Sequence, residues 1–380
     1  MYNAPCIMKK PFNPFLISGY QGARYFCDRK KETKSIVSAL ESGRNITLIS
    51  LRRMGKTELI KHAFQQIKSK KVSVIYVDLL HTTDVQTMVK EFAKATINQL
   101  SLGVMRSSLQ KITALFGNLR PAFTIDPLSG APSVEIDVQT GKQSTKTLEE
   151  ILHHLENHGT QVVVAFDEFQ IITSYPEKNV EALLRGLIQH LNNVRFIYSG
   201  SQKHILSNMF GDVKRPFYQS SQFLALESIS IKEYTSFIHT HFKDAGIALE
   251  DKEIEYILDW TYCHTFYVQF FCNKLFESKM TDVHASVYHA TEKIFEENEA
   301  VFTNYRSLIT QQQAQLLTAI AKDGWVNKPT AKEFLSRHRL TSSTVQRALP
   351  ALVQKEFLTL EKSGYRVYDV FFGRWLAAKF

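Results

Sequence analysis

The chain has 380 residues and a mass of 43.6 kDa, enough for roughly two or three domains. Its 44% hydrophobic and 22% charged residues exclude a wholly disordered or fibrous protein, and no run of about 18 apolar residues predicts a membrane span. The net charge of +9 is uneven, because residues 1–77 and 310–380 are basic whereas residues 78–309 are acidic. The basic ends either meet anions such as nucleotide phosphates or nucleic acid, or reflect chance.

The cysteines and the N-terminal residues favour a protein of the reducing cytoplasm. The four cysteines show no CxxC spacing, so neither a structural zinc site nor a disulfide framework is expected. The first ten residues lack the long apolar core of a signal peptide. We therefore expect cytoplasmic localisation and no membrane partner.

Helix and strand patterns alternate along the first hundred residues. A loosely structured lead-in over residues 1–25 contains three prolines. The expected elements that follow are a helix over 30–41, a strand over 45–50, a helix over 56–69, a strand over 72–78 and a helix over 84–100. This order predicts an α/β domain with a mainly parallel sheet.

Residues 120–145 interrupt this alternation. Two segments of alternating apolar and polar residues flank a turn over 127–132, which predicts a β-hairpin inserted into the α/β core. Beyond the hairpin we expect a helix over 147–158, a strand over 161–166, a helix over 180–191 and a strand over 194–199.

Toward the C-terminus the pattern changes twice. A capping box at Ser230 and Glu233 opens helices that continue to about residue 305, which predicts an all-α lid. Three further helices are expected after the lid. The first covers 311–322, the second begins at a cap at Thr330, and the third covers 341–355; a hairpin around 362–364 follows them. Three helices followed by a hairpin are typical of a winged helix. The predicted domains are an α/β domain over 1–226, a helical lid over 227–308 and a winged-helix domain over 309–380.

The strongest motif reads Ser-Leu-Arg-Arg-Met-Gly-Lys-Thr over residues 50–57. A phosphate-binding loop has the pattern GxxxxGK[ST]; this segment matches at Gly55, Lys56 and Thr57 but has Ser50 at the first glycine position. Gly55 lets the backbone approach the phosphates, Lys56 reaches the β- and γ-phosphates, and Thr57 offers its hydroxyl to Mg²⁺. The expected strand before the motif and the expected helix after it supply the context that phosphate binding needs.

A second motif is the hydrophobic strand that ends in Asp167 and Glu168. In P-loop enzymes an Asp at this place holds Mg²⁺, and the following Glu is placed to polarise the attacking water. Two acids alone are usually only the polar end of a strand. The two motifs together, in this order, predict a nucleotide site with Mg²⁺.

With these motifs the chain resembles the archaeal-type ATPase family within the STAND/AAA+ P-loop NTPases. The resemblance spans roughly residues 20–380 and is strongest at Arg-Arg-x-Gly-Lys-Thr over 52–57. Weaker matches lie at 26–29 with Glu32, 166–170, 199–201, 215–218, His264 and 369–376. The resemblance implies a P-loop NTPase parallel-sheet core, followed by an all-α lid and a winged helix, with ATP or ADP and Mg²⁺ as ligands.

The resemblance also implies which residues contact the nucleotide. The loop residues that it places there are Arg53, Met54, Gly55, Lys56, Thr57 and Glu58. Phe26 and Arg29 resemble the segment that lies against the adenine, although the family usually has Gly-Arg-Glu where this chain has Asp-Arg-Lys over 28–30. The alternatives are a helix-start anchor for Phe26 and, for Arg52 and Arg53, a brace of the loop or a solvated surface position.

Three further residues take roles from the family. Ser201 resembles a sensor-1 residue that hydrogen-bonds the γ-phosphate or the attacking water; the alternative is a turn at a strand end. Arg215 is a candidate arginine finger, in cis or in trans. His264 resembles the sensor-2 position of the lid, where the family commonly has His-Pro and this chain has Thr265. The alternative for His264 is a core residue.

Three hypotheses of function follow. The first is an ATP-binding switch with slow Mg²⁺-dependent hydrolysis, in which the nucleotide lies between the α/β core and the lid. The second is an ATP-dependent protein that binds duplex DNA through residues 310–380, with an architecture resembling origin-recognition ATPases and with Gln346 and Arg347 facing the DNA. The third is a nucleotide-locked scaffold for a protein partner. The sequence leaves the oligomeric state open.

Overall fold

The computed structural model describes residues 13–68, 72–101, 120–125, 132–137, 142–277 and 283–380. The chain folds into two compact units, Tyr20–Glu227 and Ser228–Phe380, and the segment that ends at Gly19 belongs with the second. We call the first the sheet unit and the second the helical unit. The chain therefore passes from one unit to the other twice, once after Gly19 and once after Glu227.

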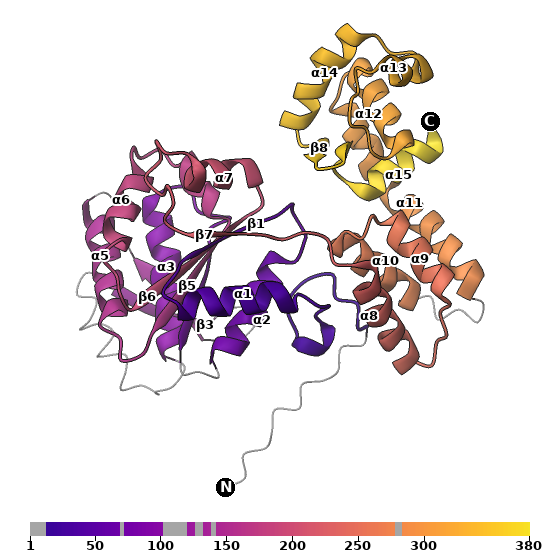
Figure 1. Cartoon of the computed structure of the whole chain (residues 1–380). Helices are drawn as coiled ribbons and strands as arrows, with labels where there is room; N and C mark the ends of the chain where they lie inside the picture. Colours follow the sequence, from indigo (N-terminus) through magenta and orange to yellow (C-terminus); the bar gives the residue numbers. More distant parts are fainter. Residues whose placement is uncertain (1–12, 69–71, 102–119, 126–131, 138–141, 278–282) are drawn as a thin grey trace. The chain divides into compact units, whose positions relative to one another are not determined.

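A five-stranded parallel sheet forms the centre of the sheet unit (Figure 1). Its strands are β1 (Ile46–Ile49), β2 (Ser73–Asp78), β5 (Val162–Asp167), β6 (Val194–Gly200) and β7 (Gln222–Ala225). Hydrogen-bonded neighbours follow the order β2-β5-β6-β1-β7. Because all five strands run in the same direction, their carboxyl ends meet at one edge of the sheet.

Helices cover both faces of this sheet, because a strand sends alternate side chains to opposite sides. From β5, Val163 and Ala165 pack with α1 and α2, whereas Val164 and Phe166 pack with α3, α5, α6 and α7. The helices are α1 (Lys30–Glu41), α2 (Lys56–Lys68), α3 (Val85–Ser101), α5 (Lys142–Glu156), α6 (Val180–Ile188) and α7 (Lys203–Gly211), with 3-10 turns η1 (Ala23–Tyr25) and η2 (Phe169–Ser174). Burial on both faces explains the continuous hydrophobic run of β5.

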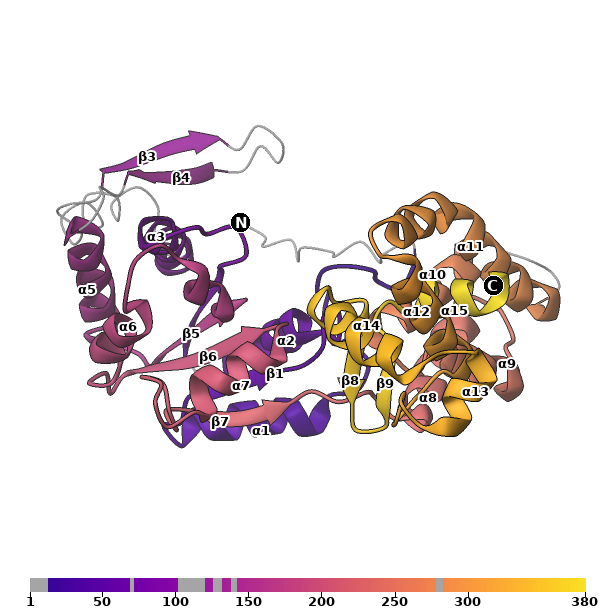
Figure 2. The ribbon, with the colours of Figure 1, turned by 90° about the horizontal axis from the view of Figure 1, so that it is seen from above.

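The predicted hairpin insertion is confirmed. Strands β3 (Arg120–Ile125) and β4 (Pro132–Asp137) pair in antiparallel fashion and form a ribbon separate from the main sheet (Figure 2). The turn predicted between them lies outside the described residues. The following helix, α5, begins at Lys142, earlier than the predicted residue 147.

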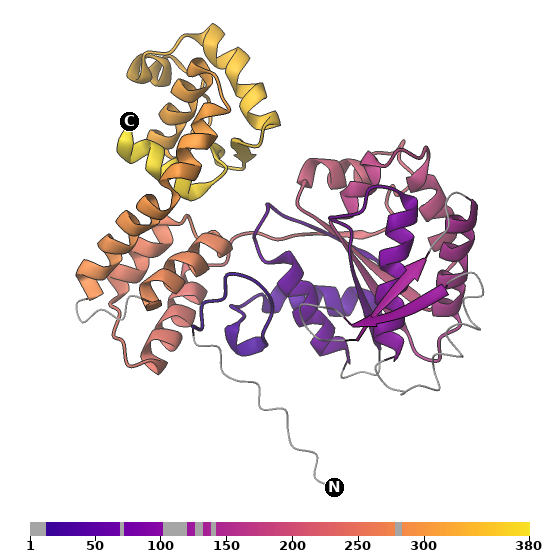
Figure 3. The same ribbon diagram turned by 180° about the vertical axis from the view of Figure 1, so that it is seen from behind.

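The helical unit contains the predicted all-α lid (Figure 3). Its helices are α8 (Ile231–Asp244), α9 (Asp251–Trp260), α10 (Thr265–Glu277) and α11 (Val283–Ser307). The predicted cap is present, because Oγ of Ser230 accepts a hydrogen bond from the backbone N–H of Glu233 over 3.3 Å. The aromatic residues over 266–276 behave as core residues: Tyr267 and Phe271 are buried.

A segment from the N-terminal end of the chain completes this helical core. Phe15 is only 1% exposed. Its ring lies 5.0–6.1 Å, centroid to centroid, from the rings of Phe237, His241, Phe242 and Phe276. The side chain of Asn273 donates a hydrogen bond to the backbone carbonyl oxygen of Phe15 over 2.7 Å. The side chain of Asn13 donates a hydrogen bond to the backbone carbonyl oxygen of Asn273 over 2.9 Å. The described part of the lead-in up to Gly19 therefore belongs to the helical unit.

The predicted winged helix follows α11 in the same unit. Its elements are α12 (Gln311–Asp323), α13 (Lys332–His338), α14 (Ser342–Gln354), β8 (Leu358–Glu361), β9 (Gly364–Val367) and α15 (Val370–Lys379). The guanidinium groups of Arg366 and Arg374 lie 5.0 Å and 4.3 Å from the ring centroid of Tyr262, which belongs to the turn between α9 and α10. These cation–π contacts attach the winged helix to the lid.

Several elements differ from the sequence-based expectations. The sequence analysis missed α7, α15 and the edge strand β7, which spans only four residues and has no fully buried residue. The predicted cap at Thr330 is wrong: the N-cap of α13 is Ala331, with no side-chain cap hydrogen bond. The turn before α13 extends one residue further than expected. In it, the backbone N–H of Ala331 donates a hydrogen bond to the carbonyl oxygen of Lys328 over 2.9 Å. None of the described helices combines the length and apolar composition that a membrane crossing requires.

The wing of the winged helix depends on one glycine. Gly364 has φ +123°, and a Cβ atom there would lie 2.6 Å from the carbonyl oxygen of Val326. We expect Gly364→Ala to lower the unfolding free energy of the helical unit by about 2 kcal/mol, because the backbone at Val326 or at residue 364 must shift to make room for the methyl group. Urea unfolding followed by tryptophan fluorescence measures this unit alone, since all three tryptophans belong to it.

Gly246→Ala is the matched control. Gly246 also has positive φ, +77°, but nothing lies within 4 Å of its Cβ position. The Gly246→Ala variant therefore measures the cost of the left-handed backbone alone. We expect it to lower the unfolding free energy of the helical unit by about 1 kcal/mol. Equal losses in the two variants would show that the close approach to Val326 has no energetic effect.

Candidate functional site

Three neighbouring strands supply the candidate site at their carboxyl ends. Ser50 follows β1, Ser201 follows β6, and β5 ends in Asp167 with Glu168 after it. Strand β6 lies between the other two. The loop before α2 and the acidic pair therefore lie at the same edge, where open α/β sheets bind their ligands.

Asp167 receives two hydroxyl groups on one oxygen. Thr57 Oγ1 donates to Oδ2 of Asp167 over 2.6 Å, and the phenol of Tyr76, on β2, donates to the same atom over 2.7 Å. Burial, and then the carboxylate of Asp167, raises the pKa of Tyr76, so that the phenol stays protonated and donates. The structure thus joins the two predicted metal ligands and adds Tyr76, which no sequence pattern had linked to them.

Lys56 is buried, with 6% exposure, and its ammonium group lies against the loop. It donates to Oγ of Ser50 over 3.2 Å and to the carbonyl oxygen of Leu51 over 3.1 Å. Burial lowers the pKa of Lys56, and the carboxylates of Glu168 and Asp167 oppose this shift. The serine at the first glycine position therefore provides an acceptor for the lysine that the motif requires.

The loop backbone turns at Arg53 and Gly55, whose φ angles are 59° and 86°. Ser50 is not among the described residues with positive φ, so a serine fits there without left-handed backbone. Met54 is 4% exposed and packs into the hydrophobic cluster of α1 and α2, which anchors the loop. Glu58 is half-buried in the first turn of α2.

Glu168 is held through a single oxygen. Its Oε2 accepts hydrogen bonds from Nε2 of Gln170 over 2.5 Å, from the backbone N–H of Ser201 over 3.2 Å and from Oγ of Ser201 over 2.9 Å. Nε of Arg52 in turn donates to Oγ of Ser201 over 3.4 Å. The structure therefore brings Ser201 to Glu168, and it adds Gln170, whose only sequence signal was its place in Asp-Glu-Phe-Gln.

Arg29 and Phe26 make contacts within the protein. The guanidinium of Arg29, 3% exposed, donates to Glu32 over 3.0 Å, to the carbonyl oxygen of Glu227 over 2.6 Å and to that of Met54 over 3.4 Å. The ring of Phe26 stacks on His62 of α2 at a centroid distance of 4.5 Å. These contacts match the anchor alternative for Phe26. The adenine contact of both residues stays a prediction.

Two further predicted residues, Arg215 and His264, have contacts elsewhere in their own units. Arg215 forms an ion pair with Glu181 of α6. Burial raises the pKa of Glu181, and the arginine opposes this shift. His264 belongs to the helical unit, directly before α10, where it is 6% exposed and its ring lies 4.8 Å from that of Tyr267. The finger and sensor-2 roles remain predictions.

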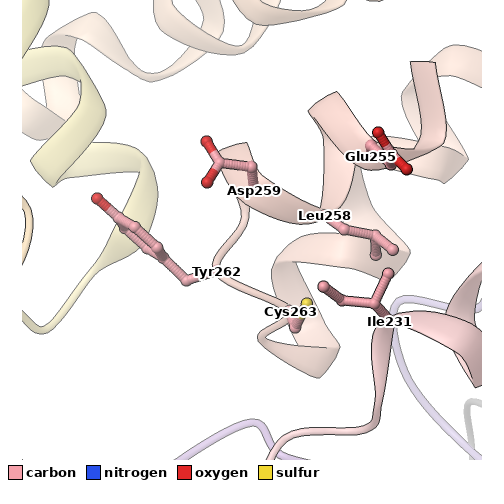
Figure 4. Close-up of a pocket in the computed structure, with 6 residues that line it drawn as sticks. All are labelled: Ile231, Glu255, Leu258, Asp259, Tyr262 and Cys263. Carbon is pink, nitrogen blue, oxygen red and sulfur yellow. The ribbon is translucent and has the colours of Figure 1, made fainter. Parts of the chain in front are cut away.

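The helical unit also contains a pocket of about 390 Å³ (Figure 4). Its lining consists of Ile231, Glu255, Leu258, Asp259, Tyr262 and Cys263. None of the residues predicted for nucleotide chemistry lines it. Burial raises the pKa of the Cys263 thiol, which disfavours its nucleophilic thiolate form.

Comparison with known protein families shows to which family the chain belongs. A family model described as an ATPase domain predominantly from Archaea matches residues 26–265, which include the loop and the acidic pair. The chain belongs to this ATPase family. A second model, described as a probable winged helix domain, matches residues 300–378 of this family member.

Solved structures share the fold of this archaeal-type ATPase chain. A Walker-type ATPase of Pyrococcus abyssi is 17% identical, with a TM-score of 0.65, and the alignment covers 96% of this chain and 99% of that one. The ORC2 protein of Aeropyrum pernix, in ADPNP–ADP complexes, is 15% identical, with a TM-score of 0.57 and coverage of 96% and 98%. A search of curated protein sequences finds no match.

The donor set of the family member suits a hard divalent cation. The hydroxyl of Thr57 and the carboxylate of Asp167 are oxygen ligands that already lie 2.6 Å apart. Among the described residues, no group of three His, Cys, Asp or Glu side chains is arranged to hold a metal. Mg²⁺ commonly takes one or two protein oxygens together with phosphate oxygens and water. The pair therefore fits Mg²⁺ that arrives with a nucleotide.

Burial of Lys56 predicts a pH-dependent stability. Because its pKa is lowered from 10.5 in the folded state, the folded chain binds this proton less tightly than the unfolded chain. The destabilisation by Lys56 is therefore complete below the lowered pKa and disappears as the pH rises from that value through 10.5. We expect Lys56→Met to raise the unfolding free energy of the nucleotide-free protein by about 1 kcal/mol at pH 7, and the gain to disappear above the unfolded pKa. Urea unfolding followed by circular dichroism at several pH values measures it.

Lys34→Met, at an exposed position of α1, is the control and should change stability little at any pH. A loss of stability in Lys56→Met at pH 7 would contradict the prediction. So would a gain that does not depend on pH.

Proposed function

We propose that the protein binds Mg²⁺-ATP and hydrolyses it slowly, and that the nucleotide state controls its conformation. The observation that carries this proposal is the hydrogen bond from Thr57 to Asp167, beside the ammonium group of Lys56 and followed by Glu168. The combination supplies a hydroxyl, a carboxylate, a cation and a base at one sheet edge, which is the set that phosphoryl transfer needs.

Phosphate binding follows from the loop and the helix behind it. The backbone N–H groups at the start of α2 have no partner within the helix, and the helix dipole favours an anion there. Lys56 exchanges its hydrogen bonds to Ser50 and Leu51 for phosphate oxygens. This exchange lets a buried cation gain a charged partner when the nucleotide binds.

Thr57 and Asp167 would hold Mg²⁺, which supplies neutralisation of the charge that develops on the phosphate oxygens. Tyr76 remains hydrogen-bonded to Asp167 and keeps the carboxylate in place. Glu168 acts as general base for the attacking water. Ser201 stands beside Glu168, and Arg215 is the candidate finger once it leaves Glu181.

The preference for ATP rests on the family and on the adenine nucleotides in the Aeropyrum pernix structure. Phe26, Arg29 and His264 are the proposed contacts outside the loop. The switch role is supported by the lid and the winged helix forming one compact unit, because a movement of that unit would carry both.

Replacement of the base tests the hydrolysis. We expect Glu168→Gln to bind ATP as tightly as the wild type and to lower turnover by about 100-fold or more, because the amide cannot accept the proton of water. Equilibrium binding of a fluorescent ATP analogue and release of phosphate from Mg²⁺-ATP measure the two effects. Glu91→Gln, on α3 of the same unit, is the matched control and should behave like the wild type. Unchanged turnover in Glu168→Gln would refute the base assignment.

A second candidate function is ATP-dependent binding of duplex DNA by the winged helix. The observation in its favour is the exposed polar face of α14, with Gln346 and Arg347, in a segment whose 11 Lys and Arg exceed its 5 Asp and Glu. Against it, several of these cations are paired: Arg337 with Asp323 and Glu333, Arg366 with Glu361, and Lys379 with Glu299. The positive charge available to DNA is therefore smaller than the sequence suggests.

Charge reversal at α14 separates this function from the others. If DNA binding occurs, we expect Arg347→Glu to weaken it about tenfold or more and to reduce its salt dependence, because a phosphate contact and its counterion release are lost. A mobility shift at several salt concentrations, with and without Mg²⁺-ATP, measures it. Absence of a shift in the wild type, with ADP retained through purification and no turnover, would favour a nucleotide-locked scaffold for a protein partner.

A further inference from the structure

The carboxylate of Glu168 is held asymmetrically. All three hydrogen bonds that it accepts from Gln170 and Ser201 end on Oε2. Among the described residues, no hydrogen bond to Oε1 is found. One oxygen is thus saturated with donors, whereas the other keeps its lone pairs for a further proton.

The amide of Gln170 has little freedom to leave this position. Gln170 is 3% exposed, within η2 directly after Glu168. Its Oε1 approaches Gly200 so closely that a Cβ atom on Gly200 would lie 1.9 Å away. The reverse orientation of the amide would set two acceptor oxygens against each other at Glu168, so Nε2 must face the carboxylate. The missing side chain at Gly200 therefore makes the room in which this amide is seated.

We propose that Gln170 is a positioning residue of the reaction: together with Ser201 it holds Oε2 of Glu168, so that Oε1 is the oxygen that receives the proton of the attacking water. This inference rests on the proposed hydrolysis and deepens it. It also accounts for the glycine between Ser199 and Ser201, because a Cβ atom there would lie 1.9 Å from Oε1 of Gln170 and 2.7 Å from Cδ1 of Leu206.

The step balances with the groups named. The oxygen of water forms a bond to the γ-phosphorus, and the proton that it loses passes to Oε1 of Glu168. The bond between the γ-phosphorus and the bridging oxygen breaks, and its electron pair stays on ADP. Gln170 and Ser201 neither gain nor lose a proton. Their contribution is to fix the direction of the base, and a displacement of about 1 Å at such a group can lower a rate by about 100-fold.

The test compares Gln170→Ala, Gly200→Ala and the double variant in the full chain, with Gln189→Ala at an exposed position as the matched control. We expect Gln170→Ala to lower kcat by about 10- to 100-fold while the Kd for ATP stays within about twofold, because only the direction of the base changes. Gly200→Ala should reduce kcat to a similar degree, since its Cβ displaces the same amide. Thermal unfolding with and without ATP shows whether each variant folds.

The double variant separates positioning from general damage. If both substitutions act through the amide, Gln170→Ala with Gly200→Ala should have the kcat of Gln170→Ala alone rather than the product of the two losses. A kcat unchanged in Gln170→Ala would overturn the proposal while leaving the hydrolysis intact. Parallel losses of kcat and ATP affinity would also overturn it, as they indicate a structural role. A wild-type chain that binds ATP without turnover would overturn the proposed hydrolysis and this inference with it.

Discussion

The hydrogen bond from Thr57 to Asp167 is the interaction on which the candidate site depends. It joins the first turn of α2 to the end of β5, although β6 separates β5 from β1 in the sheet. The parallel register makes this possible, because it aligns the ends of β5, β6 and β1 and pairs Asp78 of β2 directly with Asp167. Shortening any of these buried strands would move a member of the group by a whole residue.

Several positively charged side chains of this protein are buried, and each is stabilised by nearby hydrogen-bond, ion-pair or aromatic partners. Lys56 and Arg29 both lie in the sheet unit with little exposure and donate to carbonyl oxygens. Arg366 of the helical unit lies 4.7 Å from the ring centroid of Trp325 and pairs with Glu361. All three cations therefore have partners within the fold, which offset the cost of removing a charge from water.

The sequence predicted the site best where contacts are local or follow from strand order. The phosphate-loop motif and the acidic pair at the end of a hydrophobic strand predicted Lys56, Thr57, Asp167 and Glu168 as one site, and the parallel sheet places them at one edge. Tyr76 and Gln170 escaped prediction because each acts through one side-chain contact, from β2 and from a 3-10 turn, that no periodicity records. Edge strand β7 escaped because its four residues are too few to distinguish a strand from an irregular apolar segment. The contact of Arg29 with the carbonyl oxygen of Glu227 escaped because the two residues lie far apart in the sequence.

Phe15 has a practical consequence for anyone who divides this protein into pieces. A fragment that begins at Ser228 contains all the helices described for the helical unit, yet it lacks the ring of Phe15, which packs against Phe237, His241, Phe242 and Phe276. Removing a buried phenylalanine side chain typically lowers stability by about 3–5 kcal/mol, a large share of what a domain possesses. The C-terminal half is therefore not a self-sufficient module, and its inheritance as an independent gene segment would require a substitute for a residue encoded more than 200 codons upstream.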